Sequence, residues 1–381
     1  MNPTFERMPV SIFEQMSQAA VRHGAVNLGQ GFPDFGWPEE LLAEAARLVT
    51  SGSNQYAPSR GAPALREAIC HFYAERQGLD LTPDQLVVTS GAIEAIASLF
   101  FATLNPGDEA VIVAPAYDGY APLLRRAGAV IREVALRPPT WALTAEALEA
   151  AITPRTKLLV INNPHNPTGR LFSNAELEAV VTLARAHDLL ILSDEVWEEV
   201  IPPGATFRSL MAMAPERTIK IGSAGKIFAL TGWRVGWLAA PVELAALAAK
   251  AHQYLTFAAP PNLQGAVAFG LSRPELIAPM RGAFERAKAR LSDGLARAGY
   301  VLLPSEATYF QCVDLHASGI ALDDMAFALA AVEQAGVATI PLSPFYEGEA
   351  ERGLVRLCFA KKDETIDAGV AAMARAKAMF G

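Results

Sequence analysis

Residues 221–237 read IGSAGKIFALTGWRVGW and place one lysine, Lys226, among glycine, alanine and serine, with Arg234 following in TGWR. Partial burial lowers the pKa of a lysine, because the ammonium loses more free energy than the amine when water is removed. A neutral amine can attack a carbonyl carbon and form a Schiff base. Ser223 and Arg234 add a hydroxyl and a cationic fork, groups that hold a phosphate. The stretch therefore suggests a site for pyridoxal 5'-phosphate (PLP), although an isolated Gly-Lys pair is more often a solvated loop.

The composition indicates a folded protein with a large core. The chain has 381 residues, of which 51% are hydrophobic and 19% charged, so it is long enough for two domains and too apolar for disorder. A formal net charge of −8 and the lack of a basic run argue against a nucleic-acid surface. Three widely spaced cysteines provide neither a disulfide framework nor zinc spacing, so we expect no metal site and a reducing compartment.

The ends and the hydropathy of the chain indicate a cytoplasmic protein. The N-terminal residues, MNPTFERMPVSIFEQM, lack the basic segment and apolar run of a secretory signal. Elsewhere no apolar run reaches the length of a membrane span. We therefore expect partners among small molecules rather than membranes or nucleic acids.

Strand-like and helix-like segments alternate through the middle of the chain. Short apolar runs predict strands at residues 86–89, 111–114, 157–162, 189–194 and 218–222. Helical spacing between them predicts helices at residues 92–104, 117–127 and 174–187, the last capped by Ser173 or Asn174. Continuous apolar strands alternating with helices are typical of a buried, mostly parallel sheet in an α/β fold.

The pattern changes after about Pro274. A long helix is expected at residues 274–298, followed by strands near 308–313, 337–340 and 354–359 and by helices near 323–334 and 363–379. This is typical of a smaller α+β domain. Before a helix at 39–50 the chain has no apparent core of its own. We therefore predict an N-terminal arm (1–40) that packs with the small domain, a large α/β domain (41–280) and a small domain (281–381).

Several polar residues follow the predicted strands, at the edge where open α/β sheets bind ligands. Gly91 opens the helix after the strand 86–89, and backbone N–H groups at a helix start bind phosphate. Asn166 lies in NNPHNPTG, where two X-Pro steps extend the loop. Asp194 ends an apolar strand, where a carboxylate needs a cationic partner such as a protonated pyridine. A plain turn at Asn166 and a helix cap or ion pair at Asp194 are the alternatives.

Taken together, the motifs resemble those of a known family. NQYAPSRG, SGAIEA, NNPHNPTG, SDEVW, GSAGKIFALTGWRVGW and RLCFAKKDE occur in the order found in fold-type I, PLP-dependent aminotransferases of classes I and II. The resemblance spans nearly the whole chain and implies a seven-stranded, mostly parallel central sheet flanked by helices. VNLGQGFPDF and HQYLTF are most similar to kynurenine, methionine and glutamine-type aminotransferases and to succinyl-diaminopimelate aminotransferases.

The resemblance implies roles around the cofactor ring. Lys226 would carry the cofactor as a Schiff base and later move the proton, and Asp194 would pair with the pyridinium nitrogen. Asn166 would hydrogen-bond the phenolic oxygen of the ring and lie near the substrate carboxylate. Tyr117, in APAYDGY, would stack on the ring.

The resemblance also implies the residues around the phosphate and the substrate. Tyr56 would reach the phosphate of the neighbouring subunit, so the active sites of a homodimer would be shared. Arg356 would bind the substrate α-carboxylate through a bidentate fork, and Gly31 would line the substrate site under the N-terminal arm. The phosphate itself would be held by Gly91, Ala92, Ile93, Ser223 and Arg234.

Trp197 departs from the family pattern, because the motif that reads SDEVW here usually ends in a tyrosine that donates to the phenolic oxygen of the cofactor. An indole N–H can donate but cannot accept, and its reach differs from that of a phenol. Our hypothesis is that the cofactor loses a donor and that the pKa of its Schiff base rises. Alternatively, Trp197 points elsewhere and another group compensates.

The resemblance implies ping-pong transamination between an amino acid and a 2-oxo acid. No second arginine is identified for a dicarboxylate, which favours methionine, glutamine, aromatic amino acids or kynurenine over aspartate. A succinylated diamino acid, β-elimination from cysteine conjugates, a PLP-binding regulator and a catalytically silent binding protein are the alternatives. The aromatic residues that could line the pocket are Phe13, Phe35, Tyr117, Tyr254, Phe257, Tyr309 and Phe345, and each of them could equally be a core residue.

Overall fold

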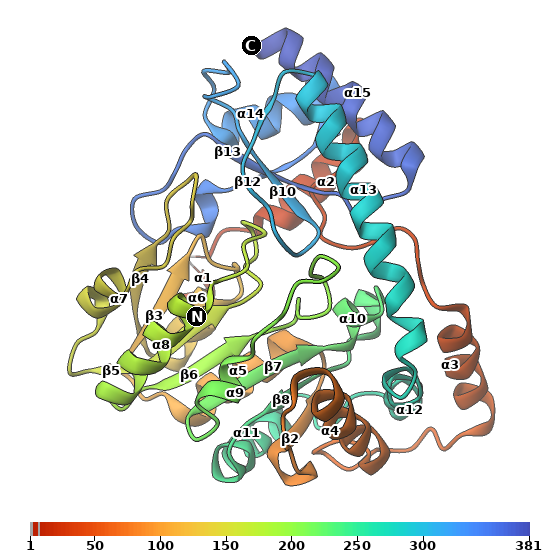
Figure 1. The fold of residues 1–381 in the computed structure, drawn as a ribbon, viewed down its shortest axis with the longest axis vertical. Helices are drawn as coiled ribbons and strands as arrows, with labels where there is room; N and C mark the ends of the chain where they lie inside the picture. The colour runs from red at the N-terminus through yellow and green to blue at the C-terminus, as the bar shows by residue number, and fades with distance from the viewer. Residues whose placement is uncertain (1–2, 7) are drawn as a thin grey trace.

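The centre of the protein is a seven-stranded sheet in the order β2-β8-β7-β6-β5-β3-β4, seen in a computed structural model that describes residues 3–6 and 8–381 (Figure 1). Only β8 runs antiparallel to its neighbours within this sheet. This confirms the predicted mostly parallel, seven-stranded α/β fold. The strands are β2 (Leu86–Thr89), β3 (Glu109–Ala114), β4 (Val130–Ala135), β5 (Thr156–Asn162), β6 (Leu190–Asp194), β7 (Thr218–Ser223) and β8 (Gly236–Ala239).

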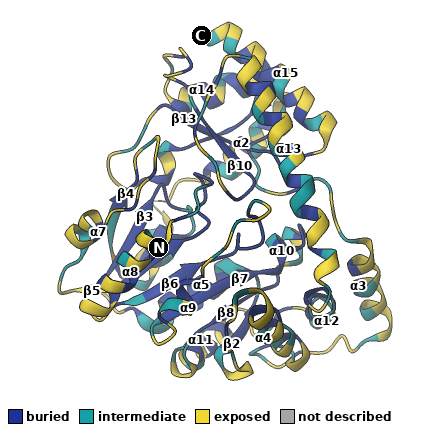
Figure 2. Ribbon diagram, viewed as in Figure 1, coloured by how far each residue is buried: buried dark blue, intermediate teal, exposed yellow. Residues whose placement is uncertain are grey.

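Apolar strands and amphipathic helices bury this sheet on both faces. β2, β3, β7 and β8 are buried along their whole length, as strands covered on two sides must be (Figure 2). Ser173 caps α8 and forms a capping box with Glu176, which confirms one of the two expected caps. The helices of this layer are α4 (Pro63–Gln77), α5 (Ala92–Thr103), α6 (Tyr120–Ala127), α7 (Ala145–Ala151), α8 (Asn174–Ala186), α9 (Leu210–Met213), α10 (Ala224–Ile227), α11 (Val242–Leu255) and α12 (Pro261–Leu271).

Two strands of the central sheet, β4 and β8, were not predicted from the sequence. β4, VIREVA, lies at the sheet edge and is only partly buried, so its polar residues broke the apolar pattern. β8, GWLA, has only four residues and begins within the stretch 221–237, whose residues indicated a binding site rather than a strand. The predicted helix at 117–127 begins only at Tyr120, because residues 117–119 form a turn.

The C-terminal part forms an antiparallel sheet, β12-β13-β10-β9, covered by helices (Figure 1). Its strands are β9 (Val301–Leu302), β10 (Phe310–Asp314), β12 (Ile340–Pro341) and β13 (Leu354–Cys358). Its helices are α13 (Ala278–Arg297), α14 (Asp324–Ala330) and α15 (Asp363–Phe380), with a π-helical turn at Ala331–Ala335. The expected helix at 274–298 is divided into a 3₁₀ turn, Pro274–Leu276, and α13. The expected strand at 337–340 is divided between β11 (Val337–Ala338) and β12.

The N-terminal segment packs against this C-terminal part. α2 (Ile12–His23), capped by Ser11, contacts β11 and β12, and β1 (Val26–Asn27) pairs with β11 in parallel. α3 (Glu39–Ser51) instead packs on α12, and the short α1 (Pro3–Glu6) contacts α6. α13 begins before residue 280, so one continuous helix crosses the predicted boundary there. The division at residues 40 and 280 stays a prediction.

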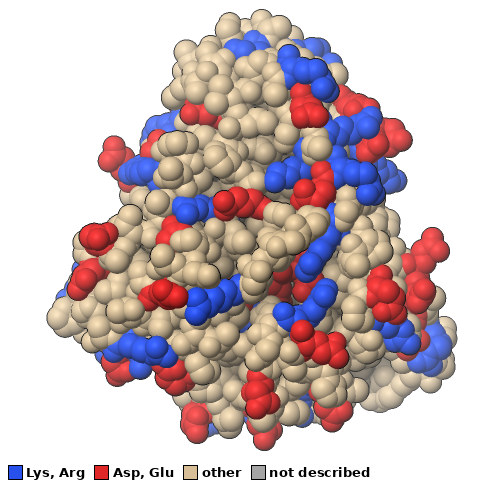
Figure 3. All heavy atoms as spheres, in the orientation of Figure 1, with Lys and Arg blue, Asp and Glu red and all other residues tan. Residues whose placement is uncertain are grey.

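The face in Figure 3 carries acidic and basic side chains close to one another rather than a single charged field. Among residues 3–6 and 8–381, no helix combines the length and apolarity that a membrane span requires.

Candidate active site

A cavity of about 150 Å³ lies where β5, β6 and β7 end, and most of the predicted cofactor residues line it. Because parallel strands present their carboxyl ends at one sheet edge, residues far apart in sequence meet there. The lining residues are Ala92, Ile93, Ile96, Tyr117, Asn162, Asn166, Asp194, Val196, Trp197, Ser223, Lys226 and Arg234.

Lys226 lies in α10, one turn beyond β7, and its ammonium points into the site. Nζ lies 3.2 Å from the Tyr309 hydroxyl and 3.4 Å from the carbonyl oxygen of Gly31. It also lies 4.5 Å from the centre of the Trp197 ring. Burial lowers the pKa of Lys226 to about 8. At pH 7 roughly a tenth of Lys226 is therefore a neutral, nucleophilic amine, and the fraction reaches about half near pH 8.

Asp194 ends β6 as a buried carboxylate without a cationic partner. The Tyr120 hydroxyl donates to Oδ2, and the Val196 amide donates to Oδ1 at 3.4 Å. No lysine, arginine or histidine of the described residues forms an ion pair with it. Burial raises the pKa of Asp194 to about 6. A protonated ring nitrogen of a bound cofactor would supply the missing positive charge, so this residue fits PLP.

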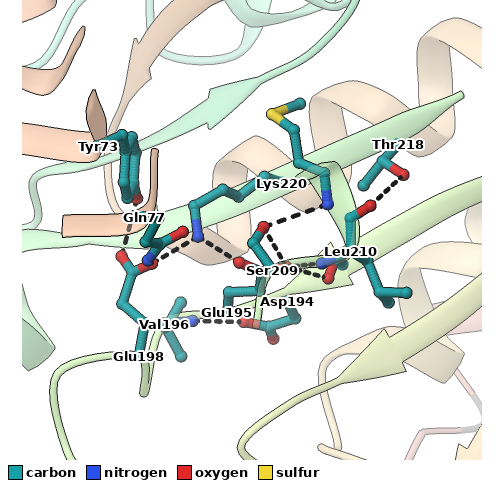
Figure 4. Close-up of polar contacts among 12 residues, drawn as sticks. Tyr73, Gln77, Asp194, Glu195, Val196, Glu198, Ser209, Leu210, Thr218 and Lys220 are labelled. Carbon is teal, nitrogen blue, oxygen red and sulfur yellow. Dashed lines mark hydrogen bonds and ion pairs between the residues drawn. The ribbon is translucent and has the colours of Figure 1, made fainter. Parts of the chain in front are cut away.

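A buried polar cluster supports the turn that follows Asp194. Figure 4 shows Lys220, from β7, between the carboxylates of Glu195 and Glu198, both of which accept hydrogen bonds from its ammonium. The Tyr73 hydroxyl donates to Glu198 at 2.8 Å. Ser209 donates to Glu195 at 3.0 Å. The cluster holds Glu195 and Glu198 in place. These two residues flank Val196 and Trp197, which line the cofactor cavity.

The start of α5 and Arg234 form the predicted phosphate end of the site. Gly91 has a φ of +81°, which favours glycine, and a Cβ at this position would collide with the Arg234 guanidinium. Arg234 Nη1 donates to the Thr231 carbonyl at 3.2 Å. Behind the loop, Glu94 accepts from the Ser90 amide at 2.6 Å. The glycine therefore allows backbone N–H groups and a guanidinium to come close together, as a phosphate site requires.

Arg356, on β13, is a buried cation, and no carboxylate among residues 3–6 and 8–381 forms an ion pair with it. Nη1 donates to Asn166 Oδ1 at 2.8 Å, and Nη2 donates to the Gly29 carbonyl at 2.9 Å. Nε is buried without a hydrogen-bond partner. The guanidinium carbon lies 3.8 Å from the centre of the Phe310 ring and 5.0 Å from that of Phe13. Burial lowers the pKa of Arg356 to about 10, so it remains charged and could pair with a substrate carboxylate.

Gly31 and Asn166 connect the arm to this arginine. Asn166 is buried and its side-chain oxygen accepts from Arg356, while its backbone N–H donates to Asn162 Oδ1 at 2.7 Å. A Cβ on Gly31 would lie 2.9 Å from the Phe310 ring and 3.8 Å from Arg356 Nη2. Glycine at position 31 therefore lets the arm approach the Phe310 ring closely. Gly31 and Asn166 both lie beside Arg356, the residue expected to bind the substrate carboxylate.

Tyr56 lies apart from this cavity. Its side chain is 87% exposed, and its ring meets the Phe257 ring edge-on at 5.3 Å. Tyr254 is equally exposed, at 86%. An exposed group of aromatic residues is typical of a surface that a partner covers.

The other aromatic candidates divide into core and site residues. Phe35 packs edge-on against Phe284, with ring centres 6.0 Å apart. Phe345 and Tyr117 line a second cavity, of about 340 Å³. Burial raises the pKa of Tyr117 to about 12, so it remains a phenol. His165 is buried against Thr168 at 2.8 Å and lies outside the lining of the cofactor cavity.

The sequence matches a family model named "Aminotransferase class I and II" over residues 23–373. The chain belongs to the class I and II aminotransferases. Members of this family depend on PLP, and the enzyme is therefore a PLP-dependent transaminase. The recognition of the family from its motifs is confirmed.

Three relatives illustrate the range within the family. The chain is 40% identical to a probable N-succinyldiaminopimelate aminotransferase of Mycobacterium tuberculosis, with 94% of each chain covered. The solved structure of that M. tuberculosis protein has a TM-score of 0.95, at 39% identity, covering 99% of this chain and 100% of that one. A methionine aminotransferase of Escherichia coli is 36% identical over 94% of each chain. A kynurenine–oxoglutarate transaminase of Rattus norvegicus is 31% identical over 94% of this chain and 93% of its own.

Three residues support the site through contacts that the sequence did not predict, although Tyr309 was expected there as a possible pocket residue. Tyr120 donates to Asp194, Tyr309 contacts Lys226, and Lys220 neutralises the glutamates beside Asp194. Tyr120 stands in APAYDGY close to Tyr117, so its place beside the cofactor could have been suspected. Lys220 carried a signal too, because a charged residue inside the apolar strand TIKIG must be paired when buried.

Proposed function

We propose that this transaminase transfers the amino group of a neutral or aromatic L-amino acid through the residues around Lys226. The observation that supports these roles is a pair of buried, unpaired charges on either side of the lysine. Asp194 lacks a cation, which the cofactor ring would supply, and Arg356 lacks an anion, which the substrate α-carboxylate would supply. A buried carboxylate and a buried guanidinium around one lysine favour the binding of a cationic ring and an anionic carboxylate over a purely structural role.

The residues of the chain would act in sequence on the amino acid. Arg356 and Asn166 would hold its carboxylate, so that the Cα–H bond faces Lys226. Lys226, with a pKa near 8, would take the Cα proton as general base and would then return the proton to complete the amino transfer. Bound PLP supplies an electron sink for the resulting carbanion. Asp194 would stabilise the positive charge that makes the ring effective.

The cofactor would be held at three further points. Tyr117 would stack on the ring, and Trp197 would lie at its phenolic edge. The phosphate would bind to the residues at the start of α5 and beyond β7, which are Gly91, Ala92, Ile93, Ser223 and Arg234. These assignments rest on the lining of the cavity together with the family motif.

The preference for a neutral side chain rests on the second cavity, which shares Tyr117 with the first. We propose that it accepts the substrate side chain beneath the N-terminal arm. Among its described lining residues the charged ones are Asp118, Arg125 and Glu347, and Arg125 already forms an ion pair with Glu347. A second substrate carboxylate would therefore compete with Glu347, whereas methionine, glutamine, aromatic residues or kynurenine would not.

A succinylated diamino acid is the second candidate, favoured by the 40% identity to the M. tuberculosis relative. It would require Arg125 to leave Glu347 and bind the succinyl carboxylate. Elimination from cysteine conjugates would use the same lysine. Pyruvate and ammonia formed without an amino acceptor would reveal this elimination.

We also propose a homodimer in the cytoplasm. The exposed rings of Tyr56, Tyr254 and Phe257 suit a surface covered by a second copy, whose phosphate site Tyr56 would reach. All three cysteines are free, which fits a reducing compartment.

Two substitutions test these roles. Lys226→Ala should abolish the visible band of the cofactor-bound lysine and the conversion of amino acids, because the amine that would bind the cofactor and move the proton is gone. Arg356→Gln should raise KM for the amino acid by more than tenfold, because a charge-assisted, bidentate contact is lost. Arg352→Gln, at an exposed arginine four residues away on the same segment, is the matched control. Appreciable turnover in Lys226→Ala, or equal KM values for the two arginine variants, would contradict the assignment.

A further inference from the structure

The Tyr309 hydroxyl is the side-chain group that hydrogen-bonds Lys226, at 3.2 Å from Nζ. This tyrosine lies at the start of the β10 region of the small C-terminal part and reaches across to α10 of the large sheet layer. It is buried, with 1% of its surface exposed. The role of Lys226 proposed above leaves this contact unexplained.

The hydrogen-bond direction at Tyr309 is fixed by its second partner. The hydroxyl donates to the Gly31 carbonyl at 2.7 Å, so only its lone pairs remain for Lys226. Burial raises the pKa of Tyr309 well above its usual value of 10, so the hydroxyl keeps its proton. Lys226 must therefore donate to Tyr309, and both Tyr309 and Gly31 offer oxygen acceptors to the same nitrogen.

Aromatic packing holds this hydroxyl in place. The Tyr309 ring meets the Trp197 ring edge-on at 4.5 Å and contacts the rings of Phe310 at 5.1 Å and Phe284 at 5.6 Å. Lys226 Nζ lies above the face of Trp197, which attracts a cation. Lys226 thus meets an indole face on one side and the Tyr309 hydroxyl on another.

We propose that Tyr309 is a positioning residue that holds the free Lys226 amine and stabilises the ammonium it becomes when it takes the substrate proton. The inference rests on the proposed role of Lys226 as the base. In that step the Cα–H bond breaks and a new N–H bond forms on Nζ. Tyr309 Oη and Gly31 O are then the acceptors within reach of the ammonium, and the Trp197 face covers it.

Other charged and titratable groups around Lys226 also shift its pKa. Asp194 favours the ammonium, whereas Arg234 and Arg356 disfavour it, and the Cys358 thiol lies on the neighbouring strand β13. None of these groups is altered when only the Tyr309 hydroxyl is removed. A change in Lys226 on removal of that hydroxyl is therefore attributable to the lost acceptor.

Tyr309→Phe tests the proposal, because it keeps the ring contacts and removes one oxygen. Tyr300→Phe is the matched control: its buried hydroxyl donates to the Met373 carbonyl at 2.9 Å, in the same part of the fold. In the full-length apoprotein, the pH dependence of Lys226 acylation, followed by peptide mass mapping, gives the pKa of Lys226. We expect this pKa to fall by about one pH unit in Tyr309→Phe and to stay unchanged in Tyr300→Phe.

The holoenzyme provides the second readout. In a single-turnover reaction with methionine, Tyr309→Phe should be slower by about tenfold at saturation, with little change in the half-saturating concentration. The isotope effect of Cα deuteration should increase. A purely structural tie between Tyr309 and the arm would instead lower the melting temperature and raise the half-saturating concentration, with the Lys226 pKa and the isotope effect unchanged.

The role of Tyr309 and the proposed transamination can each fail while the other is judged separately. If Tyr309→Phe matches Tyr300→Phe in the Lys226 pKa and in the isotope effect, the inference about Tyr309 is overturned while wild-type turnover stands. If wild-type protein converts no amino acid at all, the proposed function itself fails.

Discussion

At position 197 the chain has an indole where the motifs of similar aminotransferases usually have a phenol, and this indole lies against Lys226, the lysine that we propose as the base. The ring is buried between Tyr309, Phe310 and the Lys226 ammonium. Trp197 therefore faces the site, and the alternative that it points elsewhere is not supported. An indole face stabilises a nearby cation, whereas a phenol would also donate to the cofactor oxygen.

Trp197→Tyr should lower the pKa of the visible absorbance transition of the cofactor-bound enzyme. A restored phenol would donate to the phenolic oxygen of the cofactor and favour the deprotonated form, so the protonated band should be lost at a lower pH than in wild type. An absorbance titration of both proteins measures this shift. Trp37→Tyr, at an exposed indole, is the control. An unchanged or higher pKa in Trp197→Tyr would refute the hypothesis.

The chemistry-bearing residues were the part of the site that sequence could predict. Lys226, Asp194, Asn166 and Arg356 each stand in a motif that resembles the family's, and the structure brings them together at one cavity and its edge, while their roles stay proposals. What the sequence left out is their support, because a hydrogen bond such as that between Tyr309 and Lys226 joins segments 83 residues apart. Such contacts depend on how two layers pack, which no local pattern reveals.

At the scale of elements, a buried charged cluster links β7 to the turn that follows β6. Lys220 is fully buried between Glu195 and Glu198, and its ammonium also faces the Tyr73 ring at 4.5 Å. Burial raises the pKa of Glu198 to about 7, opposed by Lys220. Two carboxylates thus share one cation, and the turn after Asp194 depends on that balance.

Lys220→Met should destabilise the apoprotein by about 3–5 kcal/mol at pH 8, because it leaves two buried carboxylates without a cation. The loss should be smaller at pH 5. The folded-state pKa of Glu198 is already raised, and removing Lys220 raises it further, so protonation in the folded state relieves the penalty as the pH falls. Urea unfolding at both pH values measures the effect.

The control for that experiment is Lys250→Met, which removes an exposed lysine on α11. It should change the unfolding free energy little at either pH. If Lys220→Met is no less stable than Lys250→Met at pH 8, the cluster is not the support described here.

Element prediction succeeded where periodicity was strong. The buried strands β5 and β6 and the amphipathic helix α8 were predicted to within a residue or two. The edge strand β4 was missed because exposed polar positions interrupt it, and the π-helical turn at Ala331–Ala335 could not be distinguished from ordinary helix. Both misses are tertiary effects, since edge position and local unwinding depend on neighbouring elements.

At the scale of the molecule, Tyr56 lies apart from the cavity whose phosphate we propose it reaches in a partner chain. Tyr56 is 87% exposed and lies outside the lining of the cofactor cavity, next to the exposed Phe257. A dimer that brings Tyr56 to the partner's phosphate would explain both the exposure and the family motif.

Subunit complementation tests this arrangement. Tyr56→Glu should place a carboxylate against the partner's phosphate and inactivate both sites of its own dimer, and Lys226→Ala should do the same by another route. Mixed dimers of the two variants contain one intact site, so their activity should rise well above that of either parent. Tyr56→Phe, which keeps the ring, should lose about tenfold in cofactor affinity at most. A mixture no more active than its parents would contradict a shared site.

The most direct test of the account is the half-reaction of the purified holoenzyme with single amino acids, followed as the visible band of the cofactor-bound lysine disappears. The predicted result is rapid conversion by methionine, glutamine, an aromatic amino acid or kynurenine, slow conversion by aspartate, and none in Lys226→Ala. Rapid conversion by aspartate, with none by the neutral and aromatic amino acids, would contradict it.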